Sequence, residues 1–146
     1  MAADPAGGKK PYRLCIVLHA GSFDRVYEAL AIANVEVARG GEAHVLFTYG
    51  ALKRLRKGNT DLVVIEGEPA PFREEFEKAL ERGTTDSISE MIEMGKRFGG
   101  LKIYACSGAM GILNITRDEL IDGVDASTGL VGFMDLVKEA NLTLYV

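Results

Sequence analysis

Apolar residues occur along this chain in two patterns, short continuous runs and longer stretches in which they recur every three or four positions. Continuous runs of this length are typical of strands that are buried on both faces of a sheet. The runs predict five strands, at residues 14–18, 42–50, 61–67, 101–105 and 142–146, the third being very short.

Stretches with helical spacing lie between these runs. Ser22 and Ser87 stand where N-caps belong, and Glu90 completes a capping box with Ser87. Strands that alternate with helices favour an α/β fold, in which a parallel sheet carries helices on both faces. The predicted helices span residues 22–41, 51–58, 68–83, 87–100, 107–113 and 127–140, with a short helical turn at 116–123.

The composition is that of an ordinary globular protein. The 146 residues suit one core, 47% of them are hydrophobic and 26% are charged. We expect a single domain at residues 12–146 behind a flexible N-terminal tail at residues 1–11. The net charge of −4 provides no basic field, so a nucleic-acid partner is not expected.

The sequence also bounds the location of the protein. No apolar run approaches the ~18 residues of a membrane span, and the first residues lack the apolar block of a signal peptide. Two cysteines far apart in the sequence do not suggest a disulfide scaffold. We therefore expect a cytoplasmic protein with no membrane partner, in which Cys106 stays a free thiol.

Cys106 directly follows an apolar run and precedes a predicted helix. Binding sites in open α/β sheets gather just past the carboxyl ends of the strands. Ser107, Gly108 and Ala109 are small and leave the N–H groups of the helix start accessible, which favours an anion. A helix start also lowers the pKa of a cysteine, so Cys106 is a candidate nucleophile. The structural alternative is that Cys106 only fills space.

Residues after the first strand share this edge if the sheet is parallel. His19, Gly21 and Ser22 stand there, and we group them with Ser107, Gly108 and Ala109 as candidate binding residues. His19 could lower the pKa of Cys106 or donate a proton, and packing or hydration at the surface is its structural alternative. Cys15, inside an apolar strand, is predicted to be inert core, and His44, at the opposite edge, is predicted to be structural.

Other chemistries find less support. The spacing in "GAMG" does not match the phosphate-binding glycine motifs, so Gly108 and Gly111 are expected in a tight turn. A zinc site needs three or four ligands, and two histidines and two cysteines on two edges do not supply them, so no metal is expected. A Cys–His–carboxylate hydrolase would need an acid such as Asp24 beside the thiol, which the sequence does not place.

Two segments have alternative interpretations. The basic run Lys53, Arg54, Arg56 and Lys57 is predicted to be a solvated face, or else a docking surface for an acidic partner. The segment at 128–137 carries more apolar residues than one narrow helical stripe needs. That segment is either buried in the monomer core or turned toward a neighbouring subunit.

Most of the chain after the tail resembles the DsrE/DsrF-like family. The resemblance covers "LHAGSFDRVYEALAIANVEVARGGEAHVLFTYGALKRL" and, more specifically, "LKIYACSGAMGILNITRDELIDGVDASTGLVGFMDLVKEANLTLYV". The second segment shows the family order of strand, cysteine, small-residue helix start, "ELIDGV", glycine-containing helix and terminal strand. The resemblance implies a three-layer α/β/α sandwich with a five-stranded, mostly parallel sheet, assembled into a homotrimer or homohexamer.

The resemblance also implies a chemistry. Family members that move sulfur carry it as a persulfide on the cysteine after the fourth strand, which here is Cys106. This implies a sulfur carrier or sulfurtransferase that needs no metal or organic cofactor and exchanges sulfur with donor and acceptor proteins or small persulfides. Some relatives carry a second cysteine near the first. This chain has none there, which argues against an intramolecular relay.

A second function is compatible with the same fold. The loop after the fourth strand could hold a small anion or a nucleotide, with Cys106 only lining the pocket. The protein would then be a non-catalytic, oligomeric binding subunit, and the sequence does not decide whether it is an enzyme.

Overall fold

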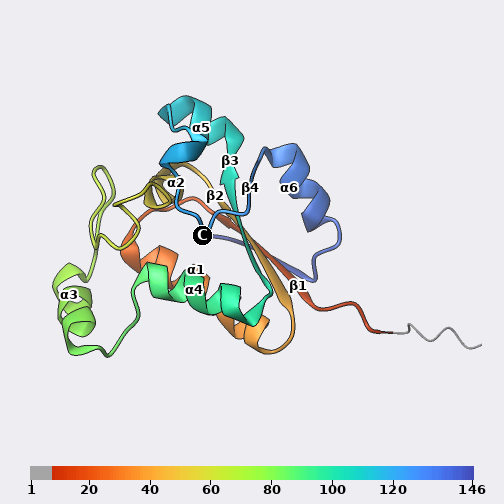
Figure 1. The fold of residues 1–146 in the computed structure, drawn as a ribbon, viewed down its shortest axis with the longest axis horizontal. Coiled ribbons are helices and arrows are strands. Elements are labelled where there is room, and N and C mark those ends of the chain that lie inside the picture. The colour runs from red at the N-terminus through yellow and green to blue at the C-terminus, as the bar shows by residue number, and fades with distance from the viewer. Residues whose placement is uncertain (1–7) are drawn as a thin grey trace, which may run out of the picture.

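All five strands run parallel in one sheet, in the order β4-β3-β2-β1-β5 (Figure 1). The computed structural model describes residues 8–146. The strands are β1 (Arg13–Leu18), β2 (Glu42–Phe47), β3 (Leu101–Cys106), β4 (Ala126–Thr128) and β5 (Leu142–Tyr145).

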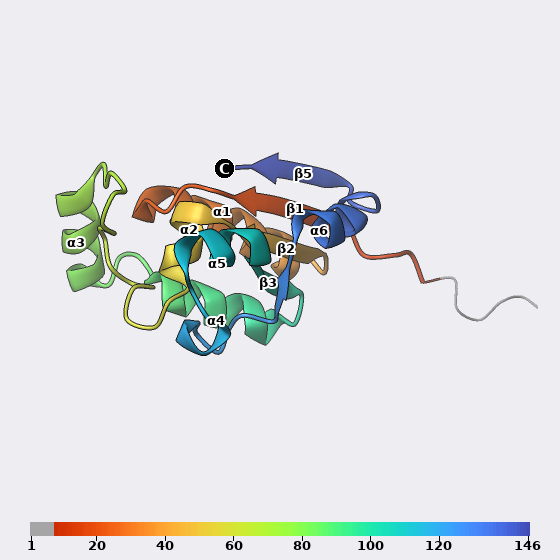
Figure 2. The same cartoon turned by 90° about the horizontal axis from the view of Figure 1, so that it is seen from above.

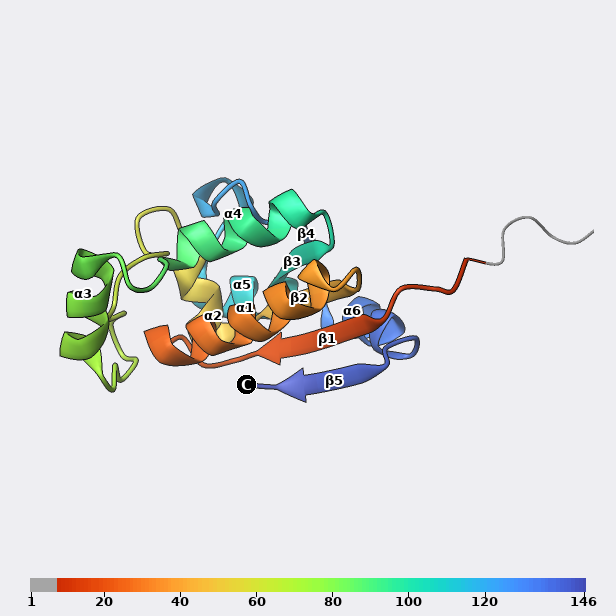
Figure 3. The same ribbon diagram turned by 90° about the horizontal axis from the view of Figure 1, so that it is seen from below.

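Helices cover both faces of this sheet. Figure 3 shows α1 and α4 on one face, and Figure 2 shows α2, α5 and α6 on the other, with α3 to one side. The helices are α1 (Phe23–Ala38), α2 (Tyr49–Arg54), α3 (Arg73–Arg82), α4 (Ile88–Phe98), α5 (Ser107–Leu113) and α6 (Leu130–Val137), with a 3₁₀ turn at Arg117–Glu119. The predicted three-layer α/β/α sandwich with a parallel five-stranded sheet is confirmed.

The strand register decides which side chains each layer covers, because successive residues of a strand point to opposite faces. Leu14 and Ala43 are register partners, and Leu14 lies in a groove beside α1. Leu46 and Tyr104 are also register partners, and the Tyr104 ring packs edge-on against Phe133 of α6, with 5.9 Å between ring centroids. Residues in step with Tyr104 therefore face α5 and α6, and Cys106 is one of them.

One predicted strand is wrong. Residues 61–67 form a loop instead, in which Ile65 is buried while Leu62 and Val64 are exposed. The loop is fixed by Arg54, whose guanidinium binds the carbonyl oxygens of Thr60 and Leu62. These backbone groups therefore bond to a side chain rather than to a neighbouring strand.

One strand of the sheet, β4, was not predicted from the sequence. Its three residues form no apolar run. It pairs with β3 through Tyr104, Ala105 and Cys106. As a consequence, Cys106 is the last residue of the third strand, not a residue that follows a fourth.

The helix ends partly match the prediction. The capping box of Ser87 and Glu90 at the start of α4 is confirmed. Ser22 is the N-cap residue of α1, but its side chain makes no capping hydrogen bond. Helix α3 begins at Arg73, later than predicted, and buries none of its residues.

The predicted tail lies only partly within the described structure. Residues 1–7 are outside the described residues, and residues 8–12 belong to neither a helix nor a strand. Among the helices at residues 8–146, none has the length and apolarity needed to cross a bilayer.

Candidate functional site

A cavity of about 480 Å³ opens at the carboxyl edge of the sheet, where all five strands contribute to its wall. Sites in open parallel sheets form at this edge, because the chain leaves each strand there in loops that can carry function. The wall residues in or directly after the strands are Val17 of β1, His19 after β1, Thr48 after β2, Cys106 of β3, Gly129 after β4, and Tyr145 of β5. The helical residues are Tyr49 of α2, Ser107, Gly108, Ala109 and Ile112 of α5, and Leu130 and Val131 of α6.

Cys106 lies in the wall of this cavity. It ends β3 in an extended conformation and is the N-cap residue of α5. Its side chain is a free thiol, and the residue is only 6% exposed. Cys106 is thus largely shielded from bulk solvent and lies in the wall of an open cavity.

Helix α5 leaves the approach to Cys106 open. Ser107 and Gly108 are exposed, and Ala109 is buried. A Cβ atom on Gly108 would meet no atom within 4 Å. The prediction of a tight turn at Gly108 and Gly111 is wrong, because both lie inside the helix and neither has a positive φ. The left-handed residue that ends α5 is Asn114, with a φ of 52°.

His19 is brought to the same cavity, as predicted from the parallel edge. Its exposed ring lies 5.3 Å from the Tyr49 ring and 6.1 Å from the Tyr145 ring, measured between centroids. Its backbone N–H donates to the carbonyl of Val146 at 2.6 Å, and its carbonyl accepts from the N–H of Ala51 at 3.1 Å. These contacts fix the backbone of His19 between two segments, while the imidazole stays accessible.

Tyr49 was not predicted as a site residue, although it lines the cavity. Its φ of 46° lies in the left-handed region, which is rare for a bulky residue. Strain of this kind persists only where surrounding contacts impose it, and it clusters at binding sites. Nothing in the local sequence signals this conformation, since tyrosine normally avoids it.

Gly21 and Ser22 do not line the cavity, so their assignment as binding residues gains no support. A Cβ atom on Gly21 would lie 2.4 Å from the carbonyl oxygen of Gly50, so only glycine permits this approach of the two backbones. Ser22 is 5% exposed at the start of α1. Both residues pack beneath the loop that carries His19 and help to hold it in place.

Arg54 completes this support, and its burial corrects the prediction of a basic solvated face. The residue is 0% exposed. Its Nε–H donates to the carbonyl of Gly21 at 2.7 Å and one Nη donates to that of Thr60 at 3.2 Å, and its guanidinium lies 5.5 Å from the centroid of the Phe23 ring. Burial lowers the pKa of Arg54 to about 10, so the group remains charged at neutral pH.

The rest of the basic run behaves differently. Arg56 is exposed and pairs with Glu119 at 2.8 Å, and the Lys57 ammonium donates to the carbonyl of Asp118 at 2.9 Å. Asp24, considered as an orienting acid for a catalytic triad, instead contributes its negative charge to the surroundings of Arg54. No contact places it beside Cys106 in the described structure.

The described side chains in the cavity wall include none of the residues that are normally charged at neutral pH. Within the described chain, its lining includes no lysine, arginine, aspartate or glutamate. The rim is apolar and exposed, with Ile112 at 69%, Leu130 at 61% and Val131 at 83%. This rim includes the start of α6, of which only Phe133 is buried, so the interpretation of residues 128–137 as a fully buried core helix is wrong.

The remaining cysteine and histidine lie at the opposite edge and are structural, as predicted. Cys15 is 0% exposed on β1, and burial raises the pKa of its thiol. His44 Nδ1 lies 2.8 Å from the Tyr104 hydroxyl, and its Nε2 lies 3.3 Å from a Glu42 oxygen. Burial lowers the pKa of His44, and it outweighs the opposing effect of the Glu42 carboxylate.

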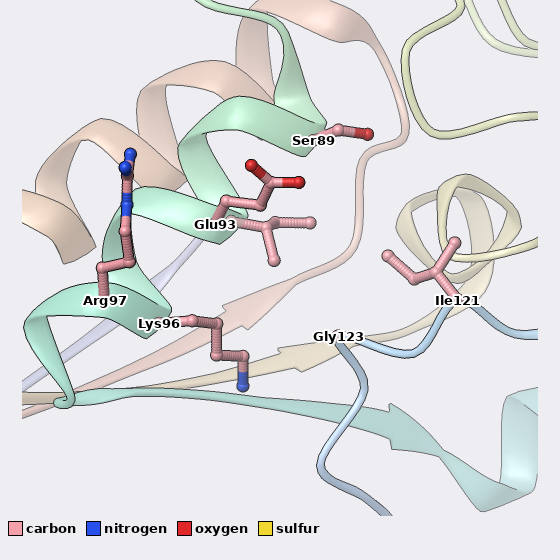
Figure 4. Close-up of a pocket in the computed structure, with 7 residues that line it drawn as sticks. Ser89, Glu93, Lys96, Arg97, Ile121 and Gly123 are labelled. Atoms are coloured by element: carbon pink, nitrogen blue, oxygen red, sulfur yellow. The ribbon is translucent and has the colours of Figure 1, made fainter.

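A second cavity of about 480 Å³ lies between α4 and residues 121–123 (Figure 4). Lys96 and Arg97 line it, and Lys96 is already paired with the Asp125 carboxylate and also donates to the carbonyl of Leu101 at 3.2 Å. Across residues 8–146, no cluster of three or more His, Cys, Asp or Glu is placed to hold a metal ion. The cavity at Cys106 is therefore the stronger candidate site.

Two curated proteins match nearly the whole chain. One is "Sulfur carrier protein DsrE2" of Allochromatium vinosum, 23% identical over 157 residues, which cover 92% of this chain and 98% of that protein. The other is "Uncharacterized protein YrkE" of Bacillus subtilis, 23% identical over 160 residues, which cover 92% of this chain and 96% of that protein.

Solved structures share the fold. The ychN protein of E. coli superposes with a TM-score of 0.61 at 17% identity, covering 92% of this chain and 99% of its own. The protein of unknown function MTH1491 of Methanobacterium thermoautotrophicum superposes with a TM-score of 0.56 at 14% identity, covering 91% and 98%. The family model of the DsrE/DsrF/DrsH-like proteins matches residues 70–145, which include Cys106 and the strands β3, β4 and β5 with α5 and α6. This chain therefore belongs to the DsrE/DsrF/DrsH-like family.

Proposed function

We propose that this protein is a sulfur carrier that moves sulfane sulfur as a persulfide on Cys106. The observation that carries the proposal is a free thiol in the wall of an open cavity at the carboxyl edge of the sheet. A relative named as a sulfur carrier protein, similar over 92% of the chain, supports it.

The proposed reaction is a pair of thiol exchanges. The Cys106 thiolate attacks the outer sulfur of a donor persulfide, forming the Cys106 persulfide and releasing the donor thiolate. An acceptor thiolate then attacks that same outer sulfur, becomes a persulfide and releases the Cys106 thiolate. One S–S bond forms and one breaks in each step, so neither step needs an oxidant, a reductant or a cofactor.

His19 is the proposed proton donor in these exchanges. Its imidazole is exposed in the wall of the cavity that Cys106 lines. A donor thiolate leaves more readily when a nearby acid protonates it. Gly108, with open space around its Cα, gives the partner sulfur room to approach.

The partner sulfur is proposed to come from a cysteine on an apolar segment of a donor or acceptor protein. Small persulfide donors in cells commonly carry carboxylates or other charges, and the described lining offers no lysine or arginine to bind them. The exposed apolar residues Ile112, Leu130 and Val131 instead match an apolar protein surface. The same neutral lining gives no specific support to the alternative of a small-anion or nucleotide-binding subunit.

Intact mass after treatment with a polysulfide tests this proposal. The protein is expected to gain about 32 Da per sulfur atom, and a reductant is expected to remove the gain. Cys106→Ser should abolish the gain. Cys15→Ser is the matched control and should retain it, because Cys15 is sealed in the core.

The outcomes separate the two functions. A Cys106→Ser variant that still gains sulfur, or a parent protein that gains none, would contradict the carrier proposal. If His19 donates the proton, the rate at which sulfur moves from Cys106 to an acceptor thiol should be lower in His19→Gln. The homotrimer or homohexamer and the cytoplasmic location stay predictions.

A further inference from the structure

Tyr49 has a strained backbone at the edge of the Cys106 cavity. Its φ of 46° lies in the left-handed region, which a bulky residue keeps only where its surroundings impose it. Within the described chain, Phe72 and Asn114 share this feature among the residues other than glycine. Asn114 ends a helix, where the conformation is common, whereas Tyr49 is the first residue of α2.

Backbone hydrogen bonds on both sides of Tyr49 hold it in this conformation. The Thr48 N–H donates to the carbonyl of Leu18 at 3.0 Å. The Ala51 N–H donates to the carbonyl of His19 at 3.1 Å. Tyr49 is therefore pinned against the same segment that carries the His19 imidazole.

The ring of Tyr49 packs beside this imidazole. The two ring centroids are 5.3 Å apart, and the Tyr145 ring lies 6.1 Å from the imidazole. Both distances fall in the range of ~4.5–7 Å at which aromatic rings attract each other. All three side chains are exposed and line the same cavity.

Among residues 8–146, no side-chain hydrogen bond or ion pair orients the His19 imidazole. A histidine that transfers protons is often held through its second ring nitrogen, by a carbonyl or carboxylate oxygen. His19 has aromatic neighbours in place of such a partner. The ring of Tyr49 is the closer of the two, and its backbone is fixed on both sides.

We propose that Tyr49 is a positioning residue for sulfur exchange at Cys106, and that its ring holds the His19 imidazole in the direction of proton transfer. This inference deepens the proposed function and rests on it. In the unloading step, the acceptor sulfur bonds to the outer sulfur of the persulfide, and the bond from that outer sulfur to Cys106 Sγ breaks. The imidazolium gives its proton to the departing Cys106 thiolate and regains one from water.

Single-turnover unloading tests the role of the ring. Cys106 is loaded with polysulfide, the excess is removed and 2-mercaptoethanol is added as the acceptor, while intact mass follows the loss of sulfur. Tyr49→Asn is expected to unload about tenfold more slowly than the parent at neutral pH, because a misplaced acid loses much of its effect. Tyr49→Phe keeps the ring and should unload at the parent rate.

A double variant separates positioning from any other role of Tyr49. A ring that acts through His19 has nothing left to position in His19→Gln, so adding Tyr49→Asn there should cause no further slowing. A ring that only shapes the cavity wall would slow unloading by the same factor in both backgrounds, and this result would overturn the inference. A Tyr49→Asn variant that unloads at the parent rate would overturn it as well.

Stability distinguishes retained strain from ordinary packing. Asparagine enters the left-handed region more readily than tyrosine, so Tyr49→Asn should leave the urea midpoint of unfolding unchanged or raise it. A lower midpoint would show that the ring serves the packing of the fold, and it would contradict the inference. Phe72→Asn is the matched control, because Phe72 has a φ of 61°, is 64% exposed and lies outside the cavity lining. It relieves the same kind of strain and should unload sulfur at the parent rate.

Failure of the carrier proposal has a different signature. A parent that gains no sulfur, or a Cys106→Ser variant that gains it, removes the carrier reaction itself. Parent rates in His19→Gln would overturn the proton-donor role and this inference, and would leave the carrier proposal standing. The inference fails alone when His19→Gln slows unloading and Tyr49→Asn does not.

NMR spectroscopy tests the contact without any sulfur chemistry. The carbon-bound protons of the His19 imidazole are assigned by their loss in His19→Gln. Their signals should shift in Tyr49→Asn and stay close to the parent positions in Tyr49→Phe, because an aromatic ring shifts the signals of protons beside it. Unmoved signals in Tyr49→Asn would show that the Tyr49 ring does not hold the imidazole.

Discussion

Arg54 shows how one buried charge can position a site that it does not touch. Its guanidinium binds carbonyl oxygens of Gly21, Thr60 and Leu62 and so ties the loop after β1 to the loop after α2. The loop after β1 also carries His19, whose imidazole lines the cavity. The position of that imidazole therefore depends on a residue on α2 that the basic run in the sequence had marked as solvated.

Replacing this guanidinium should be costly. Arg54→Met leaves three carbonyl oxygens without their donor and removes the positive charge that Asp24, Asp61 and Glu68 face, so we expect a loss of about 3–5 kcal/mol in the free energy of unfolding. Urea denaturation measures the loss. Arg56→Met is the control, because Arg56 forms an exposed ion pair worth at most about 1 kcal/mol. Equal losses in the two variants would contradict the role of Arg54.

Single residues differ in how far the sequence could predict them. Cys106 and His19 were placed at one edge because the order of strands and helices alone determines which loops meet there. The close approach of Gly21 to Gly50 and the packing of Tyr49 against His19 were not predicted, because both depend on contacts between separate segments of the chain. Burial of a charge such as Arg54 likewise depends on distant carbonyl groups, which no local pattern records.

Helix α6 forms part of the cavity wall, yet little of it is buried. Leu130 and Val131 form part of the wall, yet Phe133 is the one buried residue of the helix. The Phe133 ring packs against Tyr104, whose hydroxyl binds His44. Phe133 is thus the main buried anchor of the helix, and Leu136 and Val137 pack against the core only in part.

Removal of that anchor should release the helix. Phe133→Ala is expected to cost about 3–5 kcal/mol of stability and to raise amide hydrogen exchange at residues 130–137. Met134→Ala is the control, since Met134 is half exposed and its truncation should change neither quantity by much. Unchanged exchange in Phe133→Ala would show that other contacts hold the helix.

Elements differed in how well the apolar pattern predicted them. Strands β1, β2, β3 and β5 and helix α4 were predicted because their own residues carry the pattern. Strand β4 lacks such an apolar pattern, and its place is set by hydrogen bonds to the neighbouring strand β3. Asp125, directly before β4, donates its N–H to the Ile103 carbonyl at 2.9 Å, and its side chain accepts from the Ile103 N–H at 2.7 Å. Residues 61–67 carry the pattern of a strand, but they form a loop in which the Leu62 carbonyl bonds to the Arg54 guanidinium instead of to a neighbouring strand.

At the scale of the whole molecule, buried titratable groups make stability depend on pH. Burial lowers the pKa of His44, so the unfolded chain binds a proton that the folded chain does not. The Glu42 and Asp125 carboxyls also have lowered pKa values, through bonds with Arg13 and Lys96 that outweigh desolvation. Each group therefore favours the folded state at higher pH and loses that contribution on acidification.

The free energy of unfolding is expected to fall in two stages as the pH drops. His44 acts first, below its ordinary pKa of about 6.5, and the carboxyls follow below about 4.5. Urea denaturation at a series of pH values measures the fall. In His44→Gln the first stage should disappear while the second remains. A parent whose stability is constant between about pH 7.5 and 5.5 would contradict the role of His44.

The adjacency of β1 and β5 has a consequence for when the cavity at Cys106 forms during folding. Arg13 donates its N–H to the side chain of Asn141 across 128 positions of sequence, and contacts of such separation form late because a long loop must close first. Until Tyr145 reaches the edge of β1, the wall around Cys106 is incomplete. A nascent or refolding chain therefore presents this thiol without the complete wall, and the enclosed cavity around Cys106 arises only with the finished sheet.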